Sequence, residues 1–400
     1  MTVPSPLPPP LPAFVEATST PSLPQAASAP PPPQAKKGVL STAVSVLDWI
    51  FGFVALIALI AACSVIPVLN FLSLGYLLNV SGIIARTGRI RDGFIGVRKA
   101  SAIGSIAAGI WIVVWPARLL SDFWRDAELI APGGGVARAW HVGLVVVTVI
   151  TLAHIVWACV RGGSLWHFLW PQPLRFMRWL GAADKFSHLQ RTTVDYIISL
   201  RLPFYFWLGL RGFVGALAWL IAPVGILIAA TRLPVGGAVL LSFLGGLLLL
   251  LVAIHLPFLQ ARFAQSDRFS AIFELREVRR LFLRAPLAFW LSLLITLLFA
   301  VPLYLLKIEL TPRELAWLPS LIFVIFIFPA RVLTGWAMSR ALRHEQPRHW
   351  FPRWIARLGI VPVALAYTIV VYFTPYLSWN GSLSLLEQHA FLVPAPLMAL

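Results

Sequence analysis

The stretch GGAVLLSFLGGLLLLLVAIHLPF occupies residues 236–258 and contains no Asp, Glu, Lys or Arg. A helix needs about 20 consecutive apolar residues to cross the hydrocarbon core of a bilayer. Soluble domains rarely contain uncharged runs of this length, because their surface helices must present a polar face to water. The stretch therefore predicts a membrane-spanning helix, and it sets the fold class of the chain.

Similar apolar stretches recur along the chain, and each predicts another spanning helix. They lie at about 46–66, 102–121, 139–160, 212–231, 286–306, 317–339 and 358–377. A further stretch, 68–85, is apolar but carries Asn70, Ser73, Asn79 and Ser81. It fits either a crossing helix or a re-entrant or interfacial helix packed against protein. We therefore predict an all-α, polytopic transmembrane helical bundle of about eight or nine spans.

The composition of the chain agrees with this class and excludes others. Of 400 residues, 59% are hydrophobic and only 12% are charged, whereas soluble domains are about a quarter charged. The net charge of +17 comes from basic residues that lie between the apolar stretches, so we expect basic loops and no nucleic-acid partner. Cys63 and Cys159 both lie within apolar stretches, which argues against a disulfide framework or a cysteine metal site.

Four connections between the apolar stretches are strongly basic and hold 22 of the 32 Lys and Arg residues. They are residues 85–100, 161–201, 262–284 and 340–357. Short loops rich in Lys and Arg stay on the cytoplasmic side of the membrane. The abundance of Arg, Ala, Leu, Pro and Gly is typical of a GC-rich bacterial genome. We therefore expect the bacterial cytoplasmic (inner) membrane, with the basic loops in the cytoplasm and the C-terminus outside.

The N-terminal residues are predicted to form a disordered tail. Residues 1–35 contain twelve prolines, which fix φ and remove backbone donors. A tether fits this composition best, and a ligand for a proline-binding domain is the alternative. The predicted domains are therefore a disordered tail at 1–40, a transmembrane helical domain at 41–377 and a short C-terminal tail at 378–400.

The side on which the N-terminal tail lies depends on residues 46–85. A single crossing there places the tail outside, whereas a hairpin that turns near Pro67 places it inside. Lys36 and Lys37 directly precede the first span and favour the inside.

The basic connection 161–201 contains the tryptophan-rich stretch LWHFLWPQPLRFMRWLG, from Leu165 to Gly181. Trp prefers the headgroup region of a bilayer, and Arg binds lipid phosphates there. The stretch therefore predicts an interfacial helical segment that contacts anionic headgroups. The side chains assigned to this contact are Trp166, Trp170, Trp179, Arg175 and Arg178.

The basic connection 262–284 shows a helical amphipathic pattern from Ser266 to Arg284, with Ser266 or Asp267 as the predicted N-cap. Its polar face gathers Ser270, Glu274, Glu277, Arg280 and Arg284. Its apolar face gathers Ala271, Ile272, Leu275, Val278, Phe282 and Leu283. Arg268 and Arg279 fall within the apolar arc, from which long side chains can snorkel. We predict a helix that lies on the membrane or on the cytoplasmic face of the protein.

Two parts of the chain share an outline that suggests an internal repeat. Residues from Pro67 to Ala100, and from Pro257 to Pro286, each run from an apolar stretch through a polar segment into the next apolar stretch. Repeats of this kind are common in transporters. The outline by itself leaves duplication and chance similarity open.

Short motifs give the chain a resemblance to a known family. One run contains Gly75-Tyr76-Leu77-Leu78, Ala85-Arg86-Thr87-Gly88 and Asp92-Gly93-Phe94. A second run contains Phe269-Ser270-Ala271-Ile272-Phe273, Glu277-Val278 and Ala285-Pro286. Through these motifs the chain resembles the domain-of-unknown-function 4013 family of uncharacterised prokaryotic membrane proteins. The resemblance implies a polytopic membrane protein without an assigned activity, and the last two spans lie outside it.

Charged residues at membrane depth are the first functional candidates, because burying a charge in the bilayer is costly. Arg331 lies within 317–339, directly after Pro329 and Ala330, and Arg211 lies in the run LGLRGFVGA. Each arginine fits either an anion or lipid-headgroup contact or a helix-end residue that snorkels to the interface.

Neutral polar residues within the spans are the remaining candidates. His154 and His255 lie in apolar runs, where a lone histidine is more often a hydrogen-bonded core residue than a ligand. Asn70 and Asn79 are suited to hydrogen bonds between helices.

The sequence contains no recognisable catalytic pattern. His344 and His349 are five residues apart with Pro347 between them, so they lack the i, i+4 spacing of a zinc-binding helix. No phosphate loop, nucleophile elbow or pair of carboxylates within a span is present. We therefore predict no catalytic residue, no metal and no cofactor, and we expect membrane lipids with anionic headgroups as partners.

These observations favour a non-enzymatic protein that acts in membrane organisation or as a component of a transport or export system. A transporter with its own substrate path is one alternative, for which the repeat and Arg331 are the clues. A membrane-embedded enzyme that acts on lipid is the other.

Overall fold

The structure is a computed structural model that describes residues 39–180, 185–305, 317–377, 381–388 and 390–395. Every regular element in these residues is a helix, so the chain is an all-α protein. The predicted disordered tail at 1–40 lies outside the described residues, apart from Val39 and Leu40.

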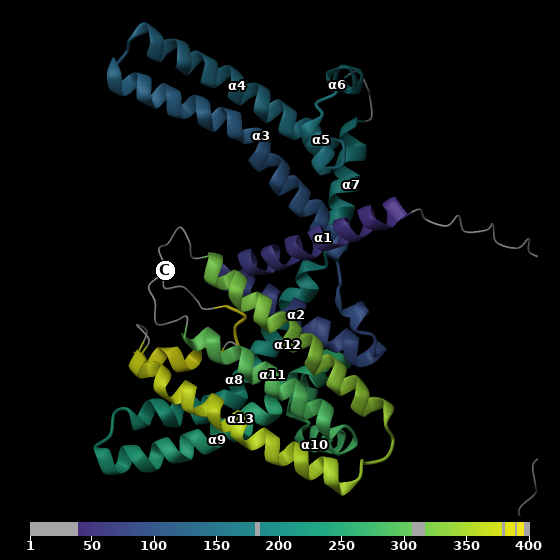
Figure 1. Cartoon of the computed structure of the whole chain (residues 1–400), viewed down its shortest axis with the longest axis vertical. Helices are drawn as coiled ribbons and strands as arrows, with labels where there is room; N and C mark the ends of the chain where they lie inside the picture. The colour runs from purple at the N-terminus through teal and green to yellow at the C-terminus, as the bar shows by residue number, and fades with distance from the viewer. Residues whose placement is uncertain (1–38, 181–184, 306–316, 378–380, 389, 396–400) are drawn as a thin grey trace, which may run out of the picture. The chain divides into compact units, whose positions relative to one another are not determined.

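In the part of the chain that the structure describes, nine long helices overlap the nine apolar stretches of the sequence. Among the described residues, eight helices are long and apolar enough to cross a membrane. The ninth, α11, qualifies together with α10, to which it is bent by 113°. The chain is therefore a multi-pass membrane protein. The nine helices are α1 (Val39–Val65), α2 (Pro67–Thr87), α3 (Val97–Ile130), α4 (Gly135–Val160), α8 (Leu202–Ala230), α9 (Val235–Ser266), α11 (Pro286–Leu305), α12 (Trp317–Arg343) and α13 (Trp350–Leu377) (Figure 1).

Shorter helices lie in the connections and after the last span. They are η1 (Ile90–Gly93), α5 (Leu165–Leu169), α6 (Pro173–Leu180), α7 (Lys185–Ser199), η2 (Phe269–Phe273), α10 (Leu275–Arg284) and η5 (Gly381–Leu386).

The helix α2 corresponds to the polar-containing stretch 68–85, and it is the most buried of the candidate spans. In its most apolar window, 72% of the residues are buried inside the protein. It packs against α8, α9 and α12. Gly75 of α2 faces Gly209 of α8, and Gly335 of α12 faces Ser81 of α2. Small residues at crossings allow the close backbone approach that holds membrane helices together, so the polar side chains of α2 have protein neighbours.

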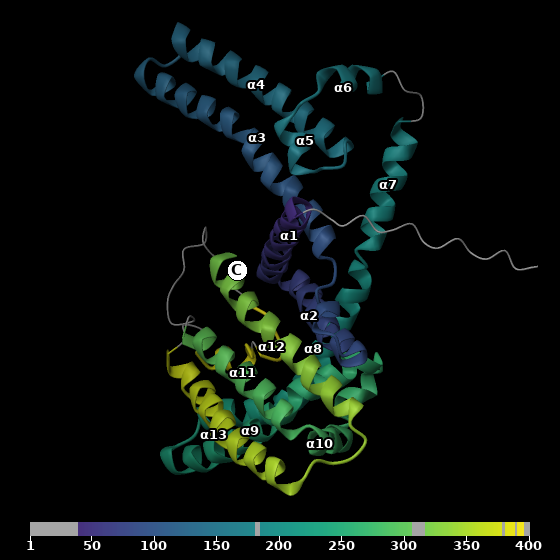
Figure 2. The same ribbon diagram turned by 45° about the vertical axis from the view of Figure 1, so that its right-hand side comes forward.

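The main hydrophobic core is formed by α2 and the helices from α8 to α13. Its large, fully buried side chains include Phe263 of α9, Phe289 of α11 and Tyr367 of α13. Within this group, α11 contacts both α12 and α13 (Figure 2). Lipid is as apolar as these side chains, so tight packing and hydrogen bonds hold the helices together more than exclusion of water does.

The helices α3 and α4 pair with each other and are little buried (Figure 1). Only 6% of the apolar window of α3 and 17% of that of α4 are buried inside the protein. Apolar side chains that the protein leaves uncovered are suited to contact lipid. At 1.5 Å per residue, α3 is about 51 Å long, which exceeds a hydrocarbon core of about 30 Å. The helix therefore extends beyond the predicted span 102–121 as far as Ile130.

The basic connection 85–100 contacts each of the other three basic connections, and we call the four together the basic face. Hydrogen bonds from basic side chains to backbone oxygens join them. They include Arg86 to Ala264 O (3.0 Å), Arg343 to Thr87 O (2.7 Å) and Lys99 to Ser199 O (2.6 Å). The connections that the charge pattern assigns to one side of the membrane are therefore neighbours in the fold.

The predicted single helix from Ser266 to Arg284 is wrong at its start. The helix α9 continues to Ser266, and Asp267 is its C-cap with φ 53°, a left-handed conformation that Asp tolerates better than most residues. The chain then forms η2, and α10 begins only at Leu275. The predicted apolar face is confirmed at Ala271, Ile272 and Val278, all of which are buried.

The tryptophan-rich stretch 165–181 is also divided rather than one helical segment. The helix α5 ends at Leu169 and α6 begins at Pro173. Between them, Gln172 adopts φ 40° and interrupts the helical path.

The bends that follow α2 and α9 have the same backbone path. Gly88 (φ 70°, ψ 10°) and Asp267 (φ 53°, ψ 21°) each end a helix in the left-handed conformation. Arg89 (φ −109°, ψ 117°) and Arg268 (φ −107°, ψ 125°) follow them in extended conformation and lead into a 3-10 turn. This likeness agrees with an internal repeat, which stays a prediction.

The chain after α13 turns back into the bundle, within the predicted C-terminal tail at 378–400. We call residues 384–388 and 390–395 the C-terminal strap. The side chains of Gln388, Phe391 and Ala395 are fully buried. Non-helical backbone is tolerated at membrane depth only where protein covers it or where it lines a cavity. The strap is therefore an integral part of the bundle.

Candidate functional site

A groove of about 600 Å³ opens between α9, α10, α11 and α13. We call it the arginine groove, because four arginines line it together with a histidine and apolar side chains. The lining residues are Ile254, His255, Phe258, Arg276, Val278, Arg279, Arg280, Phe282, Leu283, Phe289, Arg357, Ile360 and Val361.

The sequence of α10 explains why its arginines reach this groove. Val278 and Leu281 are buried against the bundle and fix the rotation of the helix. Arg276, Arg279 and Arg280 have i, i+3 and i+4 spacing, which places them on one face. All three are exposed.

The arginine groove carries more positive charge than carboxylates neutralise. Glu277 lies 3.7 Å from Arg280. Among the described residues, no carboxylate lies within ion-pair distance of Arg276, Arg279 or Arg357. Like charges that share a groove repel one another, so an anion that enters lowers the electrostatic energy of the whole set.

The inner wall of the arginine groove is apolar. The rings of Phe258 and Phe289 stack with their centroids 4.1 Å apart, and Ile360 is buried beside them. A charged rim above an apolar wall matches the headgroup and the acyl chain of an anionic lipid.

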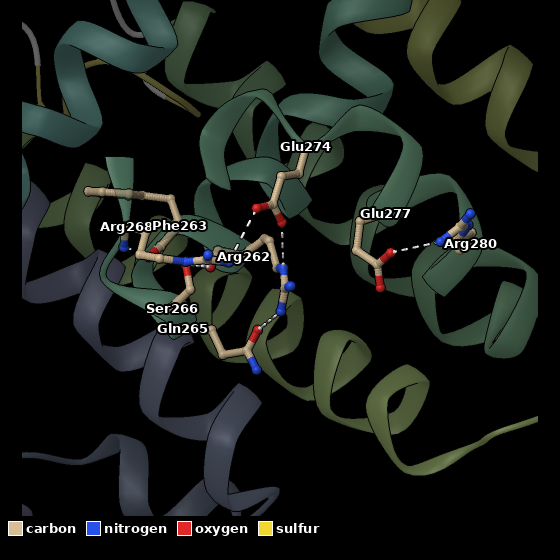
Figure 3. Close-up of polar contacts among 8 residues, drawn as sticks. All are labelled: Arg262, Phe263, Gln265, Ser266, Arg268, Glu274, Glu277 and Arg280. Atoms are coloured by element: carbon tan, nitrogen blue, oxygen red, sulfur yellow. Dashed lines mark hydrogen bonds and ion pairs between the residues drawn. The ribbon is translucent and has the colours of Figure 1, made fainter. Parts of the chain in front are cut away.

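A polar network holds the chain that leads into α10 (Figure 3). The carboxylate of Glu274 accepts hydrogen bonds from Arg262 Nε (3.2 Å) and Arg268 Nη2 (3.4 Å). Arg262 also donates to Gln265 Oε1 at 2.9 Å. The network therefore ties the end of α9 to the start of α10, and it fixes the position of the groove arginines.

Substitution of Glu274 by alanine is expected to loosen this bend. Arg262 is only 19% exposed, and without Glu274 it would lack an anion, at a cost of about 1 to 2 kcal/mol. Faster amide hydrogen exchange over residues 267–284 would report the change. Glu277→Ala is the matched control, because Arg280 is 75% exposed and such pairs contribute little. Equal exchange in the two variants would contradict the role assigned to Glu274.

A second basic groove of about 400 Å³ lies at the junction of α10 and α11. Arg284, Arg340, His344 and Arg348 line it together with Trp336. The guanidinium of Arg340 lies 5.2 Å from the centroid of the Trp336 ring, a cation–π contact that positions this arginine.

Arg331 lies in the middle of α12 and is only 3% exposed, so it does not snorkel to the interface. Its Nη1 donates to Gln260 Oε1 (2.7 Å) and its Nη2 to Ala390 O (3.0 Å). Within the described part of the chain, its Nε has no hydrogen-bond partner. The helix-end alternative is therefore excluded for this residue.

Arg211 forms an ion pair with Asp267, the C-cap residue of α9. Its Nη2 lies 2.8 Å from Asp267 Oδ1, and its guanidinium lies 5.5 Å from the centroid of the Phe263 ring. These contacts tie α8 to the end of α9. Arg211 lies in neither basic groove.

The two histidine candidates lie in different parts of the structure. His255 lines the arginine groove, and its Nδ1 lies 2.8 Å from Leu251 O in the preceding turn of α9. The Nε2 of His154 lies 2.7 Å from Phe168 O, and this contact links α4 to α5.

The two asparagine candidates of α2 are both buried. Asn70 Nδ2 donates to Ala395 O at 3.3 Å and so holds the C-terminal strap. Asn79 lies beside Tyr205 of α8.

The tryptophan-rich stretch presents some of its predicted lipid-contact residues. Trp166 and Trp170 are 68% and 62% exposed, and Arg175 is exposed. Trp179 instead packs against Trp157 of α4, with ring centroids 5.7 Å apart. The side chain of Arg178 lies outside the described residues.

The turn between α4 and α5 is held by Arg161. Its guanidinium donates to His167 O and, at 2.9 Å, to Trp170 O. Burial, and after it the charge of Arg161, hold the pKa of His167 below its ordinary value. The imidazole therefore favours its neutral form.

Several residues of these sites were not among the sequence-based candidates. Gln260 lies two residues after the predicted span 236–258, and only its polar character within the longer helix α9 could have marked it. The sequence places Arg357 in a basic connection, but it gives no sign that this residue lines a groove. Tyr367 and Gln388 meet through a 2.6 Å hydrogen bond between α13 and the strap, which no local pattern predicts.

Comparison with known proteins matches part of the chain to a family model. Residues 201–310 match the model of a family described as protein of unknown function (DUF4013). The second run of family motifs, which begins at Phe269, lies within the matched region, and the first run, which begins at Gly75, lies outside it. The matched region contains the α9, α10 and α11 residues of the arginine groove. No curated protein and no solved structure matches the chain.

Proposed function

We propose that this membrane protein binds the headgroups of anionic lipids in the arginine groove. Through this contact it acts in membrane organisation or as a component of a transport or export system. The observation that supports the proposal is a set of four arginines at the rim of an apolar groove between helices. Basic pockets of this kind bind anionic phospholipids.

The chemistry of arginine suits this role. A guanidinium offers several N–H donors in a planar fork and binds phosphate oxygens in pairs. Arg276, Arg279 and Arg357 have no carboxylate partner among the described residues, so their donors are available to a ligand. The apolar wall receives the upper part of an acyl chain.

The proposed location is the bacterial inner membrane, with the basic face in the cytoplasm. The charge pattern of the four basic connections supports this side, since Lys and Arg are retained there. Anionic lipids attract Lys and Arg with about 1 kcal/mol for each residue near the surface.

The triple variant Arg276→Ala, Arg279→Ala, Arg357→Ala is expected to bind anionic lipid about 100-fold more weakly. Loss of about 1 kcal/mol for each arginine gives this factor. Native mass spectrometry of protein with phosphatidylglycerol, with phosphatidylcholine as the neutral comparison, measures it.

The matched control removes the same charge from another basic connection. Arg89, Arg91 and Arg98 are exposed, and none of them lines either basic groove. The variant with alanine at these three positions is expected to lose only the non-specific part of the binding. Equal losses in the two triple variants would show that net charge, and not the groove, attracts the lipid.

A transporter with its own substrate path is the second candidate. The observation that favours it is the buried charge of Arg331 inside the bundle, since ionisable residues at membrane depth commonly mark substrate paths.

A further inference from the structure

The polar centre around Arg331 lies in the bundle interior and shares no residue with the arginine groove. Three helices supply it: α12 gives Arg331, α9 gives Gln260 and α13 gives Tyr367. None of these side chains is more than 3% exposed. Since polar groups at this depth are costly, each of the three side chains needs hydrogen-bond partners inside the protein.

The charge of Arg331 has no anion beside it in the described part of the chain. Among the described residues its guanidinium is only partly satisfied: Nη1 donates to the amide oxygen of Gln260, Nη2 donates to the carbonyl of Ala390, and Nε has no hydrogen-bond partner. Neutral oxygens compensate a buried charge less well than a carboxylate does. A negatively charged group would therefore stabilise this centre more than its present neutral acceptors do.

Backbone carbonyls of the C-terminal strap are the hydrogen-bond acceptors for Arg331 and Gln260. Arg331 Nη2 donates to Ala390 O (3.0 Å), and Gln260 Nε2 donates to Phe391 O (2.7 Å). Two donors that face two oxygens from adjacent residues form the arrangement that the two oxygens of a carboxylate would satisfy. The strap carbonyls thus stand where a carboxylate would bind.

An apolar cavity adjoins the strap next to this centre. It has a volume of about 150 Å³ and is lined by Pro67, Val68, Asn70, Phe71, Phe213, Leu392 and Val393. Residues 390–391 contact Arg331 and Gln260, while residues 392–393 line the cavity. Withdrawal of the strap would therefore join the polar centre to an apolar space.

We propose that Arg331 and Gln260 form a binding site for a carboxylate attached to an apolar body, and that the C-terminal strap occupies this site until the ligand displaces it. The carboxylate accepts hydrogen bonds from Arg331 Nε and Nη2 and from Gln260 Nε2. The apolar body lies in the cavity beside Phe71 and Phe213. The proposal does not depend on lipid binding in the arginine groove.

Octanoate is the probe, and a cysteine at Val393 is the reporter in full-length protein in which Cys63 and Cys159 are alanine. Val393 is 6% exposed, so its thiol should react slowly with N-ethylmaleimide. Octanoate is expected to speed this reaction about tenfold, while octan-1-ol, which has the same chain without the charge, is expected to leave it unchanged. Leu220→Cys, in α8 and 1% exposed, is the control for general loosening and should stay slow.

Two variants separate a ligand site from a purely structural anchor. Tyr367→Phe removes the hydrogen bond to Gln388 and should let lower octanoate concentrations release the strap. Arg331→Gln should abolish the response to octanoate. If Arg331→Gln does not fold, Arg331→Lys should give a response weaker than that of wild type. Equal effects of octanoate and octan-1-ol, or a wild-type response in the Arg331 variants, would overturn the proposal.

Discussion

Substitution of Gly75 by leucine is expected to prevent α2 from packing against α8 and to destabilise the protein by about 3 kcal/mol or more. The backbones of the two helices touch at this crossing. A Cβ atom at Gly75 would lie 1.7 Å from Tyr205 O, and one at Gly209 would lie 1.8 Å from Phe71 O. Both obstacles are backbone carbonyls, which cannot rotate away as a side chain can. The helices would have to separate, and the core around α2 would open.

Thermal unfolding of the purified protein, together with the fraction that remains monodisperse, measures this effect. Gly225→Leu is the matched control on α8, because a Cβ atom there meets no atom within 4 Å and the residue is exposed. Such a substitution should change stability by no more than about 0.5 kcal/mol. If Gly75→Leu is tolerated as well as the control, the close crossing does not hold the bundle together.

Substitution of Gln260 by leucine is expected to cost about 3 kcal/mol and to release the C-terminal strap. Gln260 is fully buried, and it serves two partners at once. Its Oε1 accepts from Arg331 and its Nε2 donates to Phe391 O, both at 2.7 Å. Leucine fills a similar volume but leaves Arg331 Nη1 and the buried carbonyl of Phe391 without their partner, and each loss costs about 1 to 3 kcal/mol.

Hydrogen exchange over residues 385–395 should report the release of the strap, alongside a lower unfolding temperature. Gln346→Leu is the control for the loss of an amide, because Gln346 is exposed and no hydrogen bond to its side chain is present among the described residues. It should leave both measurements unchanged. Unaltered exchange in Gln260→Leu would mean that the strap is held by other contacts.

Much of the architecture could be predicted from local sequence. Uncharged runs such as 236–258 must be helical in a bilayer, because the backbone has no other way to satisfy its hydrogen bonds there. The buried face of 271–278 followed from the helical period. The end of α9 at Asp267, before this face, was not predicted, because Ser266 and Asp267 are as suitable at the end of one helix as at the start of another.

The candidate sites were less accessible to prediction. Arg331 could be identified because a charge within an apolar run is costly wherever it points. Its partners are remote in sequence: Gln260 is 71 residues away and Ala390 is 59. No local periodicity connects such positions, so the choice between a snorkelling and a buried arginine required the packing of α9, α12 and the strap.

The sequence by itself determined the class and the spans of this membrane protein, because hydropathy and charge act residue by residue along a chain in lipid. It also determined which loops are basic. Only the tertiary structure decided that α2 is buried among α8, α9 and α12, that four arginines share one groove, and that the strap closes over Arg331. These features depend on which surfaces meet, and that is set by the close fit of glycines and side chains between helices that are distant in the chain.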